Sequence, residues 1–176
     1  MRHAVRCSLI AAAFIAVAIA RPHAQASAVK DEVLKDWTSM KDTMVKISNE
    51  MPEDKFGYRS TPPQRTYGEQ ILHIAGANVN FLKGVGGKAT PPAINMKATS
   101  KAEIVKALAD SFDYGTALIN EQTAESMLQK VKMPFLGETT GSRVYYFLIG
   151  HAWDIYGQLA VYLRLNGHVP PASQRP

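Results

Sequence analysis

Cysteine is almost absent from this sequence: Cys7 is the only one in 176 residues. Because Cys7 lies in the first ten residues, the chain after it has no disulfide, no thiolate nucleophile and no Cys-ligated zinc. No run of Lys and Arg with interleaved aromatic residues occurs, so the electrostatic footprint of a nucleic-acid-binding protein is missing. The closely spaced glycines at 84, 86 and 87 follow a helical pattern instead of preceding one, which excludes a phosphate-binding loop there.

The sequence also lacks an apolar run long enough to span a membrane. The longest, over residues 9–20, is well short of the ~20 residues that a spanning helix needs. Arg2 and Arg6 precede it, and the small-x-small pattern Ala24-Gln25-Ala26 follows. These features predict a cleavable signal peptide over residues 1–26 and a periplasmic or secreted protein, the alternative being an uncleaved membrane anchor.

Cleavage after Ala26 removes 26 of the 176 residues, and the 150 that are left suit a single domain over residues 27–176. Three of the 20 basic residues leave with the signal and no acidic ones do, so 17 basic residues face 15 acidic ones. The mature chain is therefore close to neutral. Its charge does not favour a polyanionic partner.

Apolar residues recur at helical spacing from the start of the predicted domain. Steps of four and three residues place them on one stripe of an amphipathic helix over about residues 30–49, which must end before Pro52. The stripe consists of Val33, Trp37, Met40, Met44, Ile47 and Met51.

Two capping boxes predict where the next helices begin. Thr66 has Glu69 three residues later, and Ser100 has Glu103 at the same spacing. The helix from Thr66 should end at the glycine cluster, and the helix from Ser100 should run to about Gln122.

A last long helix is predicted over about residues 142–166, with Gly167 as its left-handed cap. Residues 124–141 read as one or two helical turns followed by a loop. Period-two alternation bounded by turn dipeptides is absent, so no sheet is expected. The sequence predicts an all-α protein, a four-helix bundle with one or two long crossings.

Two histidines lie on different predicted helices, and both face the bundle interior. At about 100° per residue, His73 shares its face with apolar residues and with Glu69 and Asn80, while His151 shares its face with Ile155 and Gln158. A buried imidazole needs a hydrogen-bond partner or a metal, because an unpaired buried polar group costs ~1–3 kcal/mol. Spacing alone leaves both readings open.

The segments at 69–75 and 151–171, together with Phe56-Gly57-Tyr58-Arg59, resemble the DinB-like superfamily of small metal-binding proteins. The resemblance covers about residues 30–171. Its most specific part runs from Tyr156 to Gly167, followed by Pro170-Pro171. It implies an up-down-down-up bundle, often dimeric, that holds a divalent metal with one histidine of the second helix and two of the fourth.

Carried onto this chain, the resemblance assigns His73 and His151 as metal ligands and puts Ile155 at the third ligand position. Isoleucine cannot coordinate a cation. Asp154 lies about 60° from His151 around the helix and could supply a carboxylate instead. Two histidines and a carboxylate suit zinc, nickel, iron or manganese.

Three readings of function follow, and the sequence does not decide whether the protein is an enzyme. The first is an exported divalent-metal protein, since characterised relatives include metal-dependent, thiol-using transferases and isomerases. The second is a non-catalytic bundle that binds a small ligand or a partner, its metal site degenerate at Ile155. The third, compatible with both, is a homodimer packed through the aromatic residues of segment 142–166, namely Tyr145, Tyr146, Trp153, Tyr156 and Tyr162.

Overall fold

The computed structural model describes residues 28–174, so the predicted signal peptide over 1–26 lies outside the described residues. Four long helices dominate this part of the chain: residues 28–50, α2 (Tyr67–Leu82), α3 (Lys101–Glu121) and α5 (Gly141–Leu165). The short elements are η1 (Glu53–Lys55), α4 (Ala124–Met127), β1 (Lys130–Met133), β2 (Gly137–Thr140) and η2 (Pro171–Ser173). The described part of the chain contains no helix with both the length and the apolar character needed to cross a membrane.

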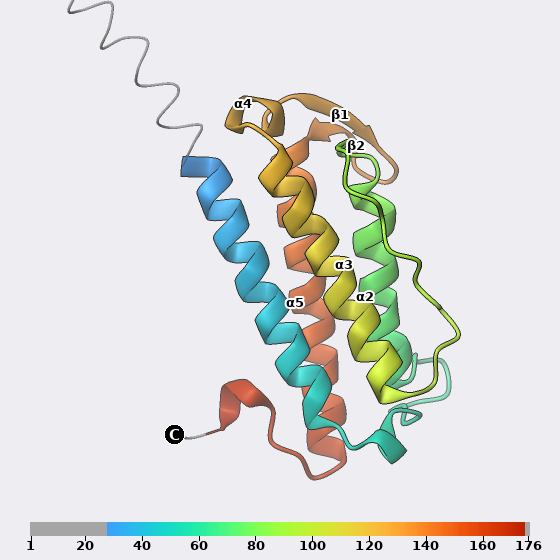
Figure 1. The fold of residues 1–176 in the computed structure, drawn as a ribbon. Helices are drawn as coiled ribbons and strands as arrows, with labels where there is room; N and C mark the ends of the chain where they lie inside the picture. The colour runs from blue at the N-terminus through green and yellow to red at the C-terminus, as the bar shows by residue number, and fades with distance from the viewer. Residues whose placement is uncertain (1–27, 175–176) are drawn as a thin grey trace, which may run out of the picture.

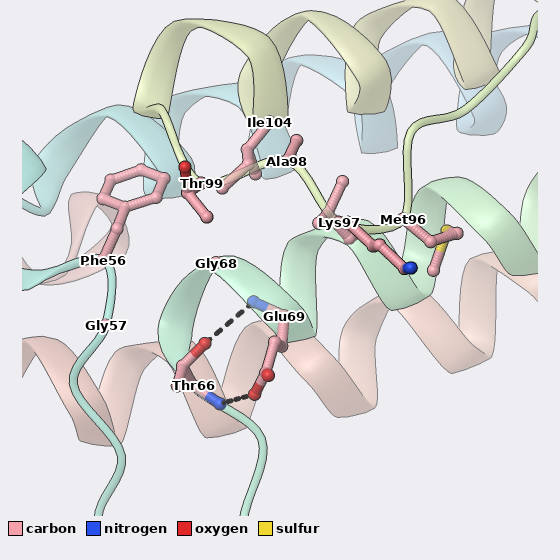
Figure 2. A pocket seen from close by; sticks show the side chains of 11 residues that line it. Phe56, Gly57, Thr66, Gly68, Glu69, Met96, Lys97, Ala98, Thr99 and Ile104 are labelled. Atoms are coloured by element: carbon pink, nitrogen blue, oxygen red, sulfur yellow. Dashed lines mark hydrogen bonds between the residues drawn. The ribbon is translucent and has the colours of Figure 1, made fainter.

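The four long helices lie alongside one another (Figure 1). The helix over 28–50 and α5 run in one direction, and α2 and α3 run in the other. Because α2 and α3 are parallel neighbours, the segment over 83–100 has to return along the length of the molecule between them. This long crossing passes beside α2 and brings residues 96–99 close to its N-terminal half (Figures 1 and 2).

The predicted helix starts and the left-handed stop are confirmed. The Thr66 hydroxyl accepts from the Glu69 N–H, and the Glu69 carboxylate accepts from the Thr66 N–H, which completes a capping box. Ser100 caps α3 through the Glu103 N–H alone, because the Glu103 carboxylate accepts from Asn95 instead. Gly167 follows α5 with φ of 79°, a conformation that glycine adopts without strain.

The expectation of no sheet was wrong. β1 and β2 form an antiparallel hairpin in which Lys130 pairs with Thr140 and Met133 with Gly137. Each strand has only four residues. β1 alternates exposed Lys with more buried Val131 and Met133, but β2 carries no apolar side chain, so the alternation is too short for a sequence pattern to reveal. It bridges the end of α3 to the start of α5, and Thr140 at its end caps α5.

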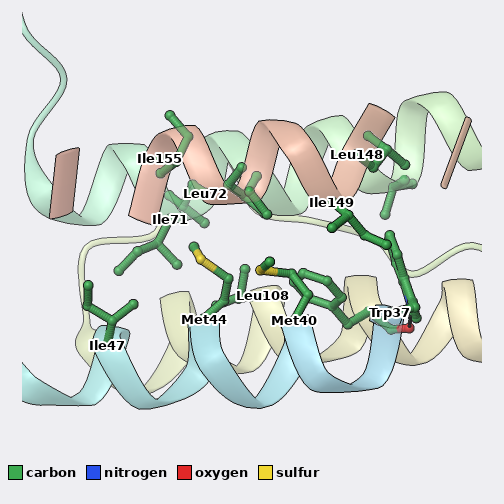
Figure 3. Packing of buried hydrophobic residues seen from close by; sticks show 14 of the residues in the cluster. Trp37, Met40, Met44, Ile47, Ile71, Leu72, Leu108, Leu148, Ile149 and Ile155 are labelled. Atoms are coloured by element: carbon green, nitrogen blue, oxygen red, sulfur yellow. Dashed lines mark hydrogen bonds between the residues drawn. The ribbon is translucent and has the colours of Figure 1, made fainter. Parts of the chain in front are cut away.

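The core is built from the predicted apolar stripes of the long helices (Figure 3). Trp37 is fully buried, and its indole N–H donates to the Phe112 carbonyl oxygen at 2.8 Å. The Trp37 ring also packs edge-on against Tyr145, with ring centroids 5.4 Å apart. Gly115 allows this packing, since a Cβ there would lie 2.4 Å from the indole.

Candidate functional site

His73 and His151 meet between α2 and α5. Their Nε2 atoms are 3.1 Å apart, and the two rings are nearly perpendicular, at 89°. His73 lies in the second turn of α2, and His151 lies near the middle of α5. Both side chains are half-buried. The structure therefore brings together two histidines that the sequence places on the interior faces of different helices.

The surroundings of the pair favour neutral imidazoles. Partial burial lowers the pKa of His73, and the positive charges of Arg65 and of a protonated His151 lower it further. Burial also lowers the pKa of His151; Asp154 opposes this effect, and Arg65 reinforces it. At neutral pH one ring can donate an N–H to the unprotonated nitrogen of the other, and either lone pair is available to a ligand once that bond opens.

Three more polar side chains continue the contact between α2 and α5. The Gln70 amide donates to the Gln158 Oε1 at 2.6 Å, and the Gln158 amide donates to an Asp154 carboxylate oxygen at 3.1 Å. We call these three residues, with His73 and His151, the polar seam. The Gln70 Oε1 is buried and has no hydrogen-bond partner.

The hydrogen bonds that connect Gln70 through Gln158 to Asp154 were not predicted from the sequence. The available signal was positional: Gln70 precedes His73 by three residues, and Gln158 follows His151 by seven, so each glutamine shares a helix face with a histidine. That spacing indicates a polar stripe on each helix. It does not indicate that the stripes face each other.

Asp154 and Ile155, which are adjacent in the sequence, have different surroundings. Asp154 is exposed, and one of its oxygens is engaged by Gln158. Ile155 is only 2% exposed and belongs to the same hydrophobic cluster as Ile71 and Leu72 (Figure 3). Within residues 28–174, no three His, Cys, Asp or Glu side chains gather into a group that could hold a metal ion.

The separation of the two histidines is compatible with a shared cation. Zinc binds imidazole nitrogen at ~2.0–2.1 Å. For two nitrogens 3.1 Å apart, the nitrogen–zinc–nitrogen angle would be roughly 100°, close to a tetrahedral angle. The donor set is nevertheless short of the usual three protein ligands. The two histidine nitrogens can serve as ligands, but the Ile155 side chain has no donor atom. The carboxylate nearest to His151 in the sequence is that of Asp154, which is therefore the candidate for the third ligand.

A cavity of about 480 Å³ opens beside His73. Its wall combines charged and apolar side chains: Arg59, Pro63, Gln64, Arg65, Glu69, Leu72, His73 and Met96. A second cavity, of about 270 Å³, shares Glu69, Leu72 and Met96 with the first (Figure 2). His73 thus faces an open pocket that Met96 of the long crossing also lines.

Comparison with known proteins agrees with this architecture. A crystal structure of a DinB-like protein from Bacillus cereus ATCC 10987 superposes with a TM-score of 0.67 at 22% identity, covering 80% of this chain and 95% of that one. A DinB-like protein from Bacillus subtilis, YjoA, gives 0.65 at 19% identity, covering 82% and 99%. No curated protein matches the sequence.

These similarities show that the fold is shared. The DinB superfamily model matches residues 36–159, which include both histidines of the pair and most of the long helices. The chain therefore belongs to the DinB superfamily.

Proposed function

We propose that the protein binds a divalent cation through His73 and His151, with Asp154 as the third donor. The observation that carries this proposal is the 3.1 Å approach of the two Nε2 atoms. Two neutral imidazoles from separate helices that meet beside a cavity are a common construction for metal sites in helical bundles. Zinc, nickel, iron and manganese all accept two nitrogens and a carboxylate oxygen.

Four residues of the polar seam have a role in this proposal. His73 and His151 supply nitrogen lone pairs, which their lowered pKa values keep unprotonated at neutral pH. Asp154 turns inward by releasing Gln158, and its negative charge offsets the repulsion between a cation and the nearby Arg65. A bound divalent cation supplies Lewis acidity, which lowers the pKa of a coordinated group. The reaction and the substrate are left open by this proposal.

The test is metal binding by the protein purified from residue 27 onward. We expect about one equivalent of zinc or nickel after loading and dialysis, measured by elemental analysis. His73→Ala and His151→Ala should each lose it. His168→Ala is the matched control, since His168 lies beyond α5 and is not part of the seam. A parent protein that takes up neither metal contradicts the proposal.

A second candidate function is a metal-free bundle that binds a small ligand or a partner. The observation that favours it is Ile155, which is packed in the hydrophobic cluster at the position where the family resemblance implies a third ligand. In that case the histidines form a hydrogen-bonded pair and the cavity alone is the functional feature. Absence of metal uptake together with an intact melting transition would favour this candidate.

Export and assembly are further proposals. The antiparallel helix directions support the up-down-down-up topology of the bundle. Trp153 is 52% exposed on α5 and packs edge-on against Tyr156, which supports a homodimer through this helix. Sedimentation equilibrium of the parent and of Trp153→Ser tests the dimer. The N-terminal residue of the protein recovered from periplasm tests cleavage after Ala26.

A further inference from the structure

The cavity beside His73 has one uncompensated positive charge. Arg59 and Glu69, both on its wall, are 3.8 Å apart, and the Glu69 carboxylate also accepts from the Thr66 N–H. The hydrogen bond from the Thr66 N–H and the positive charges of Arg59 and Arg65 keep the pKa of Glu69 below its ordinary value, so Glu69 is ionised and offsets one of the two arginine charges. The Arg65 guanidinium forms no salt bridge or side-chain hydrogen bond with another of the residues 28–174.

The backbone of Arg65 is held in place. Its carbonyl oxygen accepts from the Tyr162 hydroxyl of α5 at 2.9 Å, and the next residue, Thr66, is the N-cap of α2. The guanidinium therefore projects from a point fixed to both helices that carry the His pair. Its charge acts on both imidazoles, since it disfavours their protonated forms.

The rest of the wall suits a short aliphatic body. Leu72, Met96 and Pro63 contribute apolar side chains to the wall that also carries Arg65 and His73. Met96 lies against Gly76 of α2, where a Cβ would be 3.1 Å from its sulfur, and it is still 53% exposed. A flexible thioether of this kind adapts to ligands of different shape.

We propose that this cavity binds a small molecule with one oxyanion group and a short apolar body, the oxyanion on Arg65 and the body along Leu72 and Met96 toward His73. A carboxylate or a phosphate fits the guanidinium, whose parallel N–H groups bind either one bidentately. One free positive charge favours a single anionic group. The inference deepens the proposed function. It rests on that function only for the metal that the apolar end of the ligand would approach at the His pair.

The test is titration of the ¹⁵N-labelled protein from residue 27 onward, metal-free and zinc-loaded, with pentanoate, its neutral analogue pentanamide and inorganic phosphate at constant ionic strength. Pentanoate should shift the amide signals of Arg65 and Leu72, and pentanamide should not. Arg65→Gln should weaken pentanoate binding about tenfold or more, and Arg65→Lys should weaken it less, because it keeps the charge and loses the bidentate geometry. Phosphate that binds with the same Arg65 dependence while pentanoate does not also supports the inference, and assigns the oxyanion to a phosphate.

Arg143→Gln is the charge-matched control, since Arg143 is an exposed arginine at the opposite end of α5 from Tyr162. Equal pentanoate binding by the parent and Arg65→Gln, equal binding of pentanamide, or no shift with either anion overturns the inference. Zinc uptake is measured in a separate titration of the same variants. His73→Ala should lose zinc binding and keep pentanoate binding, whereas Arg65→Gln should lose pentanoate binding and keep zinc binding. The two measurements therefore separate the failure of one proposal from the failure of the other.

Discussion

His151 and Ile155 are one turn apart on α5, yet they belong to two different regions of the molecule. Ile155 belongs to the hydrophobic cluster with Trp37 and Tyr145, where rings and aliphatic side chains fill space. His151 belongs to the polar seam, where hydrogen bonds link α5 to α2. The core stabilises the bundle through burial and shape, whereas the seam leaves polar atoms available. A site for ligands can form at the seam because the core beside it carries the stability.

Trp37→Ala tests the first half of this comparison and should have the largest effect. Replacing a fully buried tryptophan removes its contacts with Phe112 and Tyr145 and leaves a cavity, a change that costs about 3–5 kcal/mol. Urea denaturation should show this loss in the free energy of unfolding, with zinc affinity of the remaining folded protein unchanged. A loss below about 1 kcal/mol would mean that the core is not the stabilising region.

Gln158→Leu tests the second half. It removes the acceptor for the Gln70 Nε2 and the donor to Asp154. The Gln70 Oε1 has no partner to begin with, so both polar atoms of the buried Gln70 amide are then unpaired, at a cost of about 1–3 kcal/mol for the lost bond. The double variant Gln70→Leu/Gln158→Leu should recover most of the stability, because both partners are then apolar. Chemical denaturation of the two variants checks this. Additive losses in the double variant would argue against a coupled pair.

Ile155→His replaces an apolar side chain of the core by an imidazole next to the polar seam. If the His pair is a two-nitrogen metal site, a third imidazole one turn after His151 should raise zinc affinity about tenfold, ~1.4 kcal/mol, in competition with a chromophoric chelator. The metal-free variant should lose stability, because Ile155 is 2% exposed and the new imidazole is buried. Ile155→Leu is the apolar control. Equal zinc affinity in the two variants would contradict the placement of the site.

Acidification should lower the stability that the polar seam contributes and leave the contribution of the core unchanged. This effect should be the smallest of the four predicted here. The folded-state pKa values of His73 and His151 are lowered, so below the ordinary value of about 6.5 the unfolded chain binds protons that the folded chain does not. The free energy of unfolding should therefore fall as pH drops from 6.5 through the lowered values, and should be unaffected by these groups above 6.5. Urea titrations at pH 7.5 and 5.5 measure the change. The variant His73→Gln/His151→Gln should show less of it; an equal slope in both proteins would count against the buried neutral pair.

The sequence sufficed for the parts of the structure that periodicity and local chemistry determine. The stripe from Val33 to Met51, the Thr66 cap and the Gly167 stop each depend on residues within one or two helical turns. The inward direction of His73 and His151 was predictable because each histidine shares a helix face with apolar residues. Their contact also depends on the relative height of α2 and α5.

The remaining features depend on contacts between distant segments. The pairing of Gln70 with Gln158 requires the relative height of α2 and α5, which no local pattern specifies. Arg65 and Met96 reach the cavity from irregular segments on either side of α2. The hairpin of β1 and β2 has too few residues and too little apolar alternation to be recognised. The arginine side of the site was therefore visible only in three dimensions.

The most direct test of the central claim is a long-range ¹H–¹⁵N spectrum of the imidazole nitrogens, recorded before and after one equivalent of zinc. A cation between α2 and α5 should shift the Nε2 signals of His73 and His151 together and leave both nitrogens of His168 unchanged. If zinc leaves the pair unchanged, or shifts the signal of only one of the two rings, the two histidines do not form a shared metal site.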